Sequence, residues 1–325
     1  MQATAQQFIA KMLVVFAFIL APITAFATPL VSVDWLSQRL NDDNLTIIDL
    51  RNKIDKGNYE TFLEGHIPGA IHSDYLTDGW RVGRDGVVGL LPEAKQFESL
   101  ARRLGVSAST HVVIVPAGVS STDFGSSARA YWTFKVFGHD NVSILDGGFA
   151  SWQANYPDQI EQGPFIAPEA GDFVAQFQPD IYIGTEDVAT YVENPGDAVL
   201  VDGRNTSQFY AEGKHPKAVK AGRIPSAILM SQADAYADDN NRLKSRDELK
   251  KIYNDLGDKT IVSYCNTGHW AATNWFVMSE VLGLENVWLY DGSMVEWTAN
   301  SDLPLDTSAM SNMDKLKKLM GDLLG

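Results

Sequence analysis

An internal duplication is the feature that most constrains how this chain folds. Three pairs of segments match in the same order in the two halves of the chain: IIDLRN (47–52) with LVDGRN (200–205), GHIPGAI (65–71) with GRIPSAI (222–228), and GHDNVSILDGGFASW (138–152) with GLENVWLYDGSMVEW (283–297). The offset between matching segments is about 150 residues, which is too long for a solenoid repeat. The chain therefore contains two copies of one domain.

Each copy has the same order of predicted elements, in which strands alternate with helices. A helix, a short apolar strand that ends in Asp-x-Arg, and a Gly-x-Ile-Pro turn are followed by a second strand and a polar helix. A third strand, a loop, another helix and a fourth strand complete the copy. This alternation predicts two α/β domains in tandem, each a mainly parallel sheet with helices on both faces. Ligands of such sheets bind beyond the carboxyl ends of the strands.

The segments outside the copies define the domain boundaries. The N-terminus combines one charge, Lys11, with a short apolar run and the sequence Ala-Phe-Ala at 25–27, which is the pattern of a cleaved secretory signal. A membrane anchor is the alternative, but the run is shorter than the ~20 residues that a spanning helix needs. We expect a signal peptide at 1–27, a first domain at 28–155, a linker at 156–180, a second domain at 181–301 and a tail at 302–325. The mature protein is then periplasmic or secreted, and we expect a monomer.

Cys265 is the only cysteine in this acidic chain of 325 residues, in which 26 Lys and Arg face 41 Asp and Glu and the net charge is −15. A single cysteine excludes an intramolecular disulfide and a zinc site built on cysteines. The negative charge argues against nucleic acid or an anionic membrane as a partner. An anionic substrate would have to be attracted by a local site.

Cys265 lies between the apolar strand TIVSY (260–264) and a predicted helix at 270–283. Backbone N–H groups of residues 266–271 can point at the sulfur, Gly268 permits an unusual backbone conformation, and the helix N-terminus adds positive potential. These effects favour the thiolate, which is the nucleophilic form. The alternative is a buried structural cysteine, because a free cysteine also packs as a small apolar residue.

Together, the Asp-x-Arg strands, the Gly-His-Ile-Pro-Gly-Ala turn, the strand that ends in cysteine and the Asp-Gly turn followed by Trp resemble the rhodanese family. More closely, about residues 30–300 resemble the tandem-domain sulfurtransferases that use thiosulfate or 3-mercaptopyruvate. In that family the first domain has usually lost its cysteine, which agrees with VPAGVSSTDF at 115–124. Ser120 and Ser121 lie near the lost position, in a loop that reads as a few residues longer.

The resemblance implies a sulfurtransferase that forms a persulfide on Cys265. The thiolate attacks the outer sulfur of a small anionic donor, which releases sulfite or pyruvate, and a thiol, cyanide or protein acceptor then takes the sulfur. This reaction needs no metal and no organic cofactor. The loop after Cys265 matches the pattern of neither donor type; we expect thiosulfate as the first donor and 3-mercaptopyruvate as the second.

Several residues are expected to bind the donor, and each has a structural alternative. The candidate donor-binding residues are Arg204, Asn266, Thr267, Gly268, His269 and Trp270. Arg204 matches the family arginine that holds the donor, or else pairs with Asp202. His269 is the only possible cation of the loop and is mostly neutral at pH 7. Trp270 narrows the pocket or packs the helix onto the sheet.

Basic residues and histidines also occur outside the loop that follows Cys265. A positive rim around the site, or only a solvated loop, is expected from Lys214, Lys217, Lys220 and Arg223. His66 either faces the interdomain cleft or caps its own turn, and the Asp49–Arg51 pair is structural. No chemistry is assigned to His72, His111, His139 and His215.

Two other functions remain open at this point. Cysteine phosphatases use a similar loop, but they need an arginine six or seven residues after the cysteine to clamp phosphoryl oxygens, where this chain has Ala271 and Ala272. A sulfur-carrying or binding module without turnover would present the same residues as an enzyme.

Overall fold

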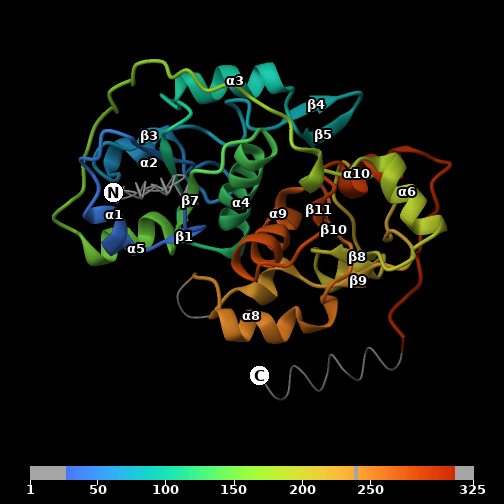
Figure 1. The fold of residues 1–325 in the computed structure, drawn as a ribbon. Helices are drawn as coiled ribbons and strands as arrows, with labels where there is room; N and C mark the ends of the chain where they lie inside the picture. Colours follow the sequence, from blue (N-terminus) through green and yellow to red (C-terminus); the bar gives the residue numbers. More distant parts are fainter. Residues whose placement is uncertain (1–26, 238–240, 312–325) are drawn as a thin grey trace, which may run out of the picture.

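The computed structural model describes residues 27–237 and 241–311 (Figure 1). The expected signal peptide up to residue 26 and the tail from residue 312 lie outside the described residues. Within the described ranges, no helix has the length and apolar character needed to cross a bilayer.

The first copy is built on a five-stranded parallel sheet in the order β1-β7-β6-β2-β3. Its strands are β1 (Leu30–Val31), β2 (Leu45–Asp49), β3 (Ile71–His72), β6 (His111–Val115) and β7 (Val142–Leu145). Its helices are α1 (Val33–Ser37), α2 (Tyr59–Glu64), α3 (Ala94–Arg103), α4 (Ser121–Val136) and α5 (Gly148–Asn155). After His111, the central strand β6 is a run of four buried aliphatic residues, because a parallel sheet covered on both faces has no solvated side.

The second copy repeats this topology with a parallel sheet in the order β11-β10-β8-β9. Its strands are β8 (Val199–Asp202), β9 (Ile228–Leu229), β10 (Ile261–Tyr264) and β11 (Val287–Leu289). Its helices are α6 (Thr185–Glu193), α7 (Thr206–Phe209), α8 (Arg246–Ile252), α9 (His269–Trp275) and α10 (Ser293–Ala299), with 3-10 turns η1 (Pro179–Ile181), η2 (Gln232–Ala235) and η3 (Asn254–Leu256). Tyr182 pairs in parallel with Leu289, in the place that β1 takes beside β7. The predicted fold class is confirmed.

The helix after Cys265 differs in detail from the prediction of one helix over 270–283. It begins at His269 and changes after Trp275 into the π-helix η4 (Phe276–Val281). A π-helix bonds each N–H one residue further back than an α-helix does, and hydrophobic spacing does not distinguish the two.

A hairpin in the first domain was not predicted. Strands β4 (Val82–Arg84) and β5 (Val87–Leu90) pair through a turn in which both residues have positive φ, as a tight hairpin requires. Each strand is short and contains a glycine, so neither shows the alternation that indicates a strand. The hairpin reaches the second domain: β5 packs against α10, and Gly89 lies so close to Thr267 that a Cβ there would meet its carbonyl.

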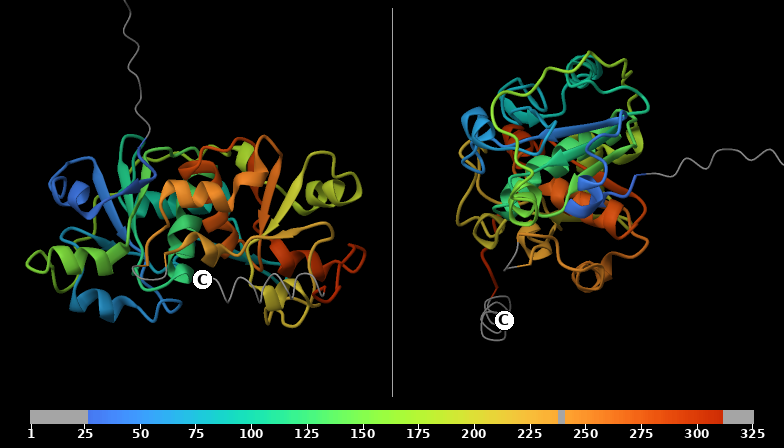
Figure 2. Two further views of the ribbon diagram at one scale, coloured as in Figure 1. Left: turned by 90° about the horizontal axis from the view of Figure 1, so that it is seen from below. Right: turned by 90° about the vertical axis from the view of Figure 1, so that its left-hand side faces the viewer.

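One hydrophobic cluster spans both domains, beside a smaller cluster within each. Helices α4 and α9 pack against each other between the two sheets (Figure 1, Figure 2). The Tyr131 ring of α4 lies 6.4 Å from the ring of Trp275 and 4.9 Å from that of Phe276. One cluster of buried residues extends from Ile48 in the first domain to Leu289 in the second. The apolar faces that carry α4 and α9 are therefore buried by contact between the domains.

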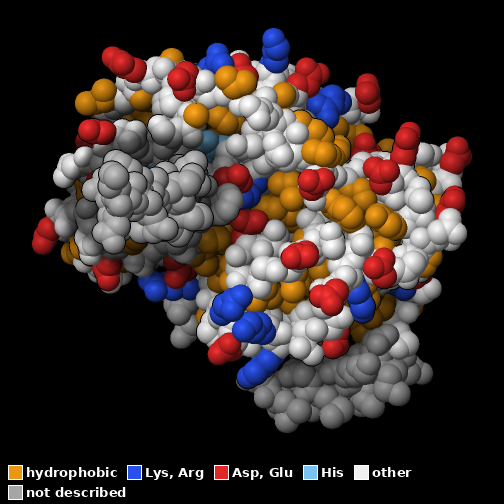
Figure 3. Space-filling model, viewed as in Figure 1, with side chains coloured by type: hydrophobic (Ala, Val, Ile, Leu, Met, Phe, Trp, Pro, Cys, Tyr) orange, Lys and Arg blue, Asp and Glu red, His pale blue; other side chains and the backbone are white. Residues whose placement is uncertain are grey.

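On the face seen in Figure 3, the negative charge is dispersed. In Figure 3, Asp and Glu side chains are spread over both domains on the visible face, while hydrophobic side chains gather in its centre. An anion is therefore not attracted by this face as a whole, and local cations decide where it binds.

A buried ion pair joins the domains beside the loop that follows Cys265. The guanidinium of Arg129 lies 3.2 Å from the carboxylate of Asp291, and both side chains are buried. Arg129 also donates to the carbonyl groups of Gly89 and Thr267. The N–H of Leu91 donates to the Asp291 carboxylate. Helix α4, the hairpin and the loop therefore meet at one cluster.

Arg129→Met should destabilise the protein by about 3–5 kcal/mol, because the buried Asp291 carboxylate then keeps the Leu91 N–H but has no opposite charge beside it. Urea unfolding followed by tryptophan fluorescence measures this loss. The control Lys250→Met removes an exposed pair with Asp247, whose atoms are 4.0 Å apart, and should cost less than about 1 kcal/mol. Equal losses in the two variants would contradict a structural role of the buried pair.

Candidate active site

Cys265 lies directly after β10, in the loop that leads into α9, and it is almost completely buried. The Oγ of Ser293 accepts hydrogen bonds from the N–H groups of Cys265 (3.0 Å) and Gly268 (3.2 Å). The N–H of Met294 donates to the Cys265 carbonyl. Gly268 has a φ of +68°, and a Cβ there would overlap the Arg129 guanidinium. Both the backbone and the available space therefore require glycine.

The loop presents backbone N–H groups that the protein does not use. The N–H groups of Asn266 and Thr267 donate to no acceptor among the described residues. Those in the first turn of α9 have no acceptor within the helix. Because converging N–H groups at a helix start bind anions, the loop can stabilise negative charge next to Cys265.

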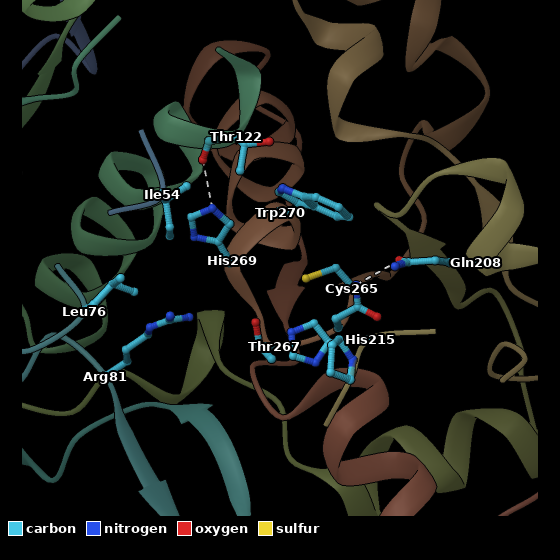
Figure 4. Close-up of a pocket in the computed structure, with 12 residues that line it drawn as sticks. Ile54, Leu76, Arg81, Thr122, Gln208, His215, Cys265, Thr267, His269 and Trp270 are labelled. Atoms are coloured by element: carbon cyan, nitrogen blue, oxygen red, sulfur yellow. Dashed lines mark hydrogen bonds between the residues drawn. The ribbon is translucent and has the colours of Figure 1, made fainter. Parts of the chain in front are cut away.

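A cavity of about 310 Å³ opens beside Cys265 at the boundary between the domains (Figure 4). The first domain contributes Ile54, Leu76, Arg81 and Thr122 to its wall, and the second contributes Gln208, His215, Pro216, Cys265, Asn266, Thr267, His269 and Trp270. In Figure 4 the Cys265 sulfur points into the cavity, toward the guanidinium of Arg81. Of the donor-binding residues expected from sequence, all but Arg204 and Gly268 line this cavity.

The hydrogen bonds of the first domain show which residue stands in place of Cys265. Pro116 directly follows β6, as Cys265 directly follows β10. The carbonyl of Pro116 accepts a hydrogen bond from an N–H in the first turn of α5, and the carbonyl of Cys265 accepts the equivalent bond from α10. The counterpart of Cys265 is therefore Pro116, and not Ser120 or Ser121, which follow later in the loop.

A carboxylate of the first domain occupies the equivalent loop. This loop spans 116–120, only one residue more than 265–268, so the expectation of a few extra residues was wrong. Asp123, the third residue of α4, accepts a hydrogen bond from the Val119 N–H at 2.9 Å, and burial raises the pKa of Asp123 above its usual value. The third residue of α9 is Ala271, whose methyl group leaves the N–H groups of its loop free.

His269 is a neutral hydrogen-bonding residue rather than a cation. Its Nε2 lies 2.8 Å from the carbonyl oxygen of Thr122, and its Nδ1 lies 3.1 Å from the Tyr75 hydroxyl. Because a carbonyl oxygen only accepts, Nε2 carries the proton and Nδ1 accepts from Tyr75. Burial, followed by the charge of Arg81, lowers the pKa of His269 to about 3. His269 therefore fastens its loop to the first domain.

Arg204 forms the ion pair that the sequence left as the alternative. Its guanidinium lies 2.6 Å from the Asp202 carboxylate and donates to the Gly222 carbonyl. The side chain is buried and does not line the cavity. Arg51 forms the same pair with Asp49 at 2.8 Å in the first domain. In this structure Arg204 therefore has the structural position that both copies share.

The expected positive rim does not form part of the cavity wall. None of the four basic residues expected to form this rim lines the cavity: Lys214, Lys217, Lys220 and Arg223. Arg223 instead pairs with Asp306. His215 does line the cavity, although we assigned it no chemistry from sequence. Burial, followed by the charge of Arg81, lowers the pKa of His215, so it is neutral at pH 7.

His66 lies away from this cavity. Its ring stacks on Phe62 with centroids 3.8 Å apart, and its Nδ1 lies 2.9 Å from the Phe62 carbonyl oxygen. Its backbone pairs with Glu161 of the linker. The contribution to the interdomain cleft is therefore not supported, and the alternative of a capped turn fits the placement.

The residues that sequence reasoning missed come mainly from the first domain. Arg81 directly precedes β4, and Ile54 and Leu76 form apolar wall. In the second domain, Gln208 accepts a hydrogen bond from the Asn266 amide at 2.9 Å. A sequence signal that could have pointed to Arg81 is that the segment around the hairpin has no equivalent in the second copy. Within the described part of the chain, no group of three His, Cys, Asp or Glu side chains could hold a metal ion.

Comparison with known proteins identifies relatives over most of the chain. Residues 32–155 and 185–300 each match the family described as Rhodanese-like domain. The 3-mercaptopyruvate sulfurtransferase of Escherichia coli is 32% identical over 286 residues, which cover 85% of this chain and 97% of that protein. A putative thiosulfate sulfurtransferase of Saccharopolyspora erythraea is 34% identical over 291 residues, with coverages of 85% and 95%.

A solved structure agrees with these matches. The crystal structure of SseA from Escherichia coli, described as a 3-mercaptopyruvate sulfotransferase with the rhodanese fold, is 30% identical in sequence. It superposes with a TM-score of 0.70 and covers 82% of this chain and 99% of its own.

The buried neutral His269 predicts a loss of stability in acid. The unfolded chain takes up a proton near pH 6.5 and the folded chain only near pH 3, so stability falls as the pH is lowered between these values. From pH 7 to pH 5 the loss due to this residue is about 2 kcal/mol. In urea unfolding at pH 7 and pH 5, His269→Gln should lose about that much less than the wild type. If His269→Gln and the wild type lose the same stability between pH 7 and pH 5, the pKa of His269 does not differ between the folded and the unfolded chain.

Proposed function

The chain belongs to the rhodanese family, and on this basis we propose that it is a sulfurtransferase that carries the transferred sulfur as a persulfide on Cys265. One observation carries the proposal: the Cys265 thiol borders a cavity, while the N–H groups of Asn266 and Thr267 in its loop have no acceptor among the described residues. A nucleophile, space for a donor and stabilisation of negative charge occur together.

In the proposed first step, the Cys265 thiolate attacks the sulfur of the donor. With 3-mercaptopyruvate, an S–S bond forms and the C–S bond breaks; the carbon keeps the electron pair and takes up the thiol proton, which yields pyruvate. With thiosulfate, the S–S bond of the donor breaks and sulfite leaves. A thiolate or cyanide then attacks the outer sulfur and restores the Cys265 thiolate. Between the steps, the N–H groups of the loop stabilise the charge on the outer sulfur.

The cavity favours 3-mercaptopyruvate as the first donor, which reverses the order expected from sequence. Of the side chains that line the cavity, Arg81 alone is positively charged at neutral pH, because His215 and His269 are neutral. One cation balances one carboxylate but only half the charge of thiosulfate. The Escherichia coli relative named for 3-mercaptopyruvate matches over most of this chain.

The cysteine phosphatase alternative has little support. Ala271 and Ala272 are buried and offer no group that could clamp a phosphoryl oxygen. Arg129 reaches the carbonyl of Thr267, but its charge is paired with Asp291. A sulfur carrier without turnover requires the same site as the enzyme, and the experiment below separates the two.

The setting of the protein is also part of the proposal. The N-terminal pattern supports cleavage after Ala27 and a periplasmic or secreted mature protein. The single cysteine has no partner within the chain, so it stays available as a thiol in such a compartment. The protein acts as a monomer. The sulfur acceptor is a small thiol, cyanide or a protein thiol.

Purified mature protein incubated with donor and without acceptor should gain the mass of one sulfur atom on the peptide that contains Cys265. With cyanide added, it should form thiocyanate continuously, faster from 3-mercaptopyruvate than from thiosulfate. Cys265→Ser, which replaces the sulfur by oxygen at the same position, should do neither, because an alkoxide is not accessible at neutral pH and cannot carry sulfur.

The outcomes of this experiment are distinct. Loading of Cys265 without repeated thiocyanate formation would identify a carrier. Equal activity of the wild type and Cys265→Ser with both donors would show that Cys265 is not the sulfur acceptor. A higher rate with thiosulfate would reverse the proposed order of donors and leave the sulfurtransferase function intact.

A further inference from the structure

Arg81 is a cation in the wall of the cavity with no carboxylate partner among the described residues. It is half-buried, and it makes no ion pair and no side-chain hydrogen bond with any described residue. The buried arginines of this protein differ in this respect: Arg51, Arg129 and Arg204 each contact a carboxylate. A partly desolvated guanidinium with unused donors is a binding site for an oxyanion.

The position of Arg81 is maintained by residues of both domains. Its guanidinium carbon lies 4.8 Å from the ring centroid of Tyr75, so the face of the ring supports the cation. Tyr75 is completely buried, and its hydroxyl is bonded to Nδ1 of His269. The orientation of Arg81 is thereby linked to the loop that contains Cys265. This arrangement uses the ring face and leaves the N–H donors of Arg81 free.

The charge of Arg81 acts inside the cavity. Arg81 is the largest cause after burial that lowers the pKa of both His215 and His269. These histidines stand on the wall formed by the second domain, and Figure 4 shows the guanidinium pointing from the side of the first domain toward Cys265. A small anion with its sulfur at Cys265 therefore lies within the field of this cation.

We propose that Arg81 binds the anionic group of the sulfur donor, and that the first domain thereby completes the substrate site of the second. The inference rests on the proposed function and adds to it the residue that selects the donor. It assigns anion binding to a side chain of the inactive copy, since Arg204 is already neutralised by Asp202. A donor with one carboxylate and a nearby sulfur fits one guanidinium opposite a thiol.

Steady-state kinetics of Arg81→Met with 3-mercaptopyruvate and with thiosulfate test this assignment. Methionine keeps much of the apolar volume and removes the charge. We expect kcat/KM for 3-mercaptopyruvate to fall roughly 10- to 100-fold, mainly through KM, because a charge-assisted hydrogen bond to the donor is lost. Arg81→Lys should recover part of the loss, since it restores the charge without the bidentate geometry.

Lys53→Met is the matched control. Lys53 is exposed, lies next to Ile54 of the cavity wall and has no side-chain partner among the described residues. The Lys53→Met substitution removes one positive charge, as Arg81→Met does, but removes no group that lines the cavity. Its kcat/KM for 3-mercaptopyruvate should therefore stay within about twofold of the wild-type value. Circular dichroism and urea unfolding of each variant identify any loss of folding.

The result separates this inference from the proposed function. If Arg81→Met loads sulfur onto Cys265 at saturating donor but needs a much higher donor concentration, both stand. If folded Arg81→Met has the wild-type KM for both donors, Arg81 is not the anion-binding residue, although the sulfurtransferase function stands. If wild-type Cys265 takes up sulfur from neither donor, the proposed function fails, and the inference about Arg81 with it.

Discussion

The buried ion pair between Arg129 and Asp291 is the interaction on which the candidate active site depends. Arg129 belongs to α4 of the first domain and Asp291 follows β11 of the second, so the pair exists only when the domains are packed together. The same guanidinium donates to the carbonyl of Thr267 and leaves no room for a Cβ at Gly268. The loop that follows Cys265 therefore takes its shape partly from the first copy. Leaving either charge unpaired in this core costs several kcal/mol.

The two copies show how a common scaffold can carry the proposed nucleophile in one half only. Their sheets have the same strand order and their strand ends carry the same Asp–Arg pair. The differences are local: Pro116 replaces Cys265, and Asp123 stands where the second copy has Ala271. In the first copy the carboxylate uses the N–H groups of the loop. In the second copy those groups are left for a substrate.

The fold was largely predictable from sequence because it depends on patterns that the duplication repeats. The alternation of strands and helices was visible in both halves, and the place of Cys265 at a strand end was visible in the second. The short hairpin β4-β5 was not, because its strands lack alternation. The cavity wall was predicted only where it follows Cys265 along the chain. Arg81, Ile54 and Leu76 come from the other domain, and no pattern within one copy indicates which surface covers the site.

The most direct test of the account is a crystal structure of the mature protein treated with 3-mercaptopyruvate in the absence of an acceptor. We predict electron density for one additional sulfur atom bonded to Sγ of Cys265, inside the cavity and within reach of the N–H groups of residues 266–271. Density for a product or unreacted donor should show its carboxylate at Arg81. An unmodified Cys265, with the donor bound elsewhere on the protein, would contradict the account.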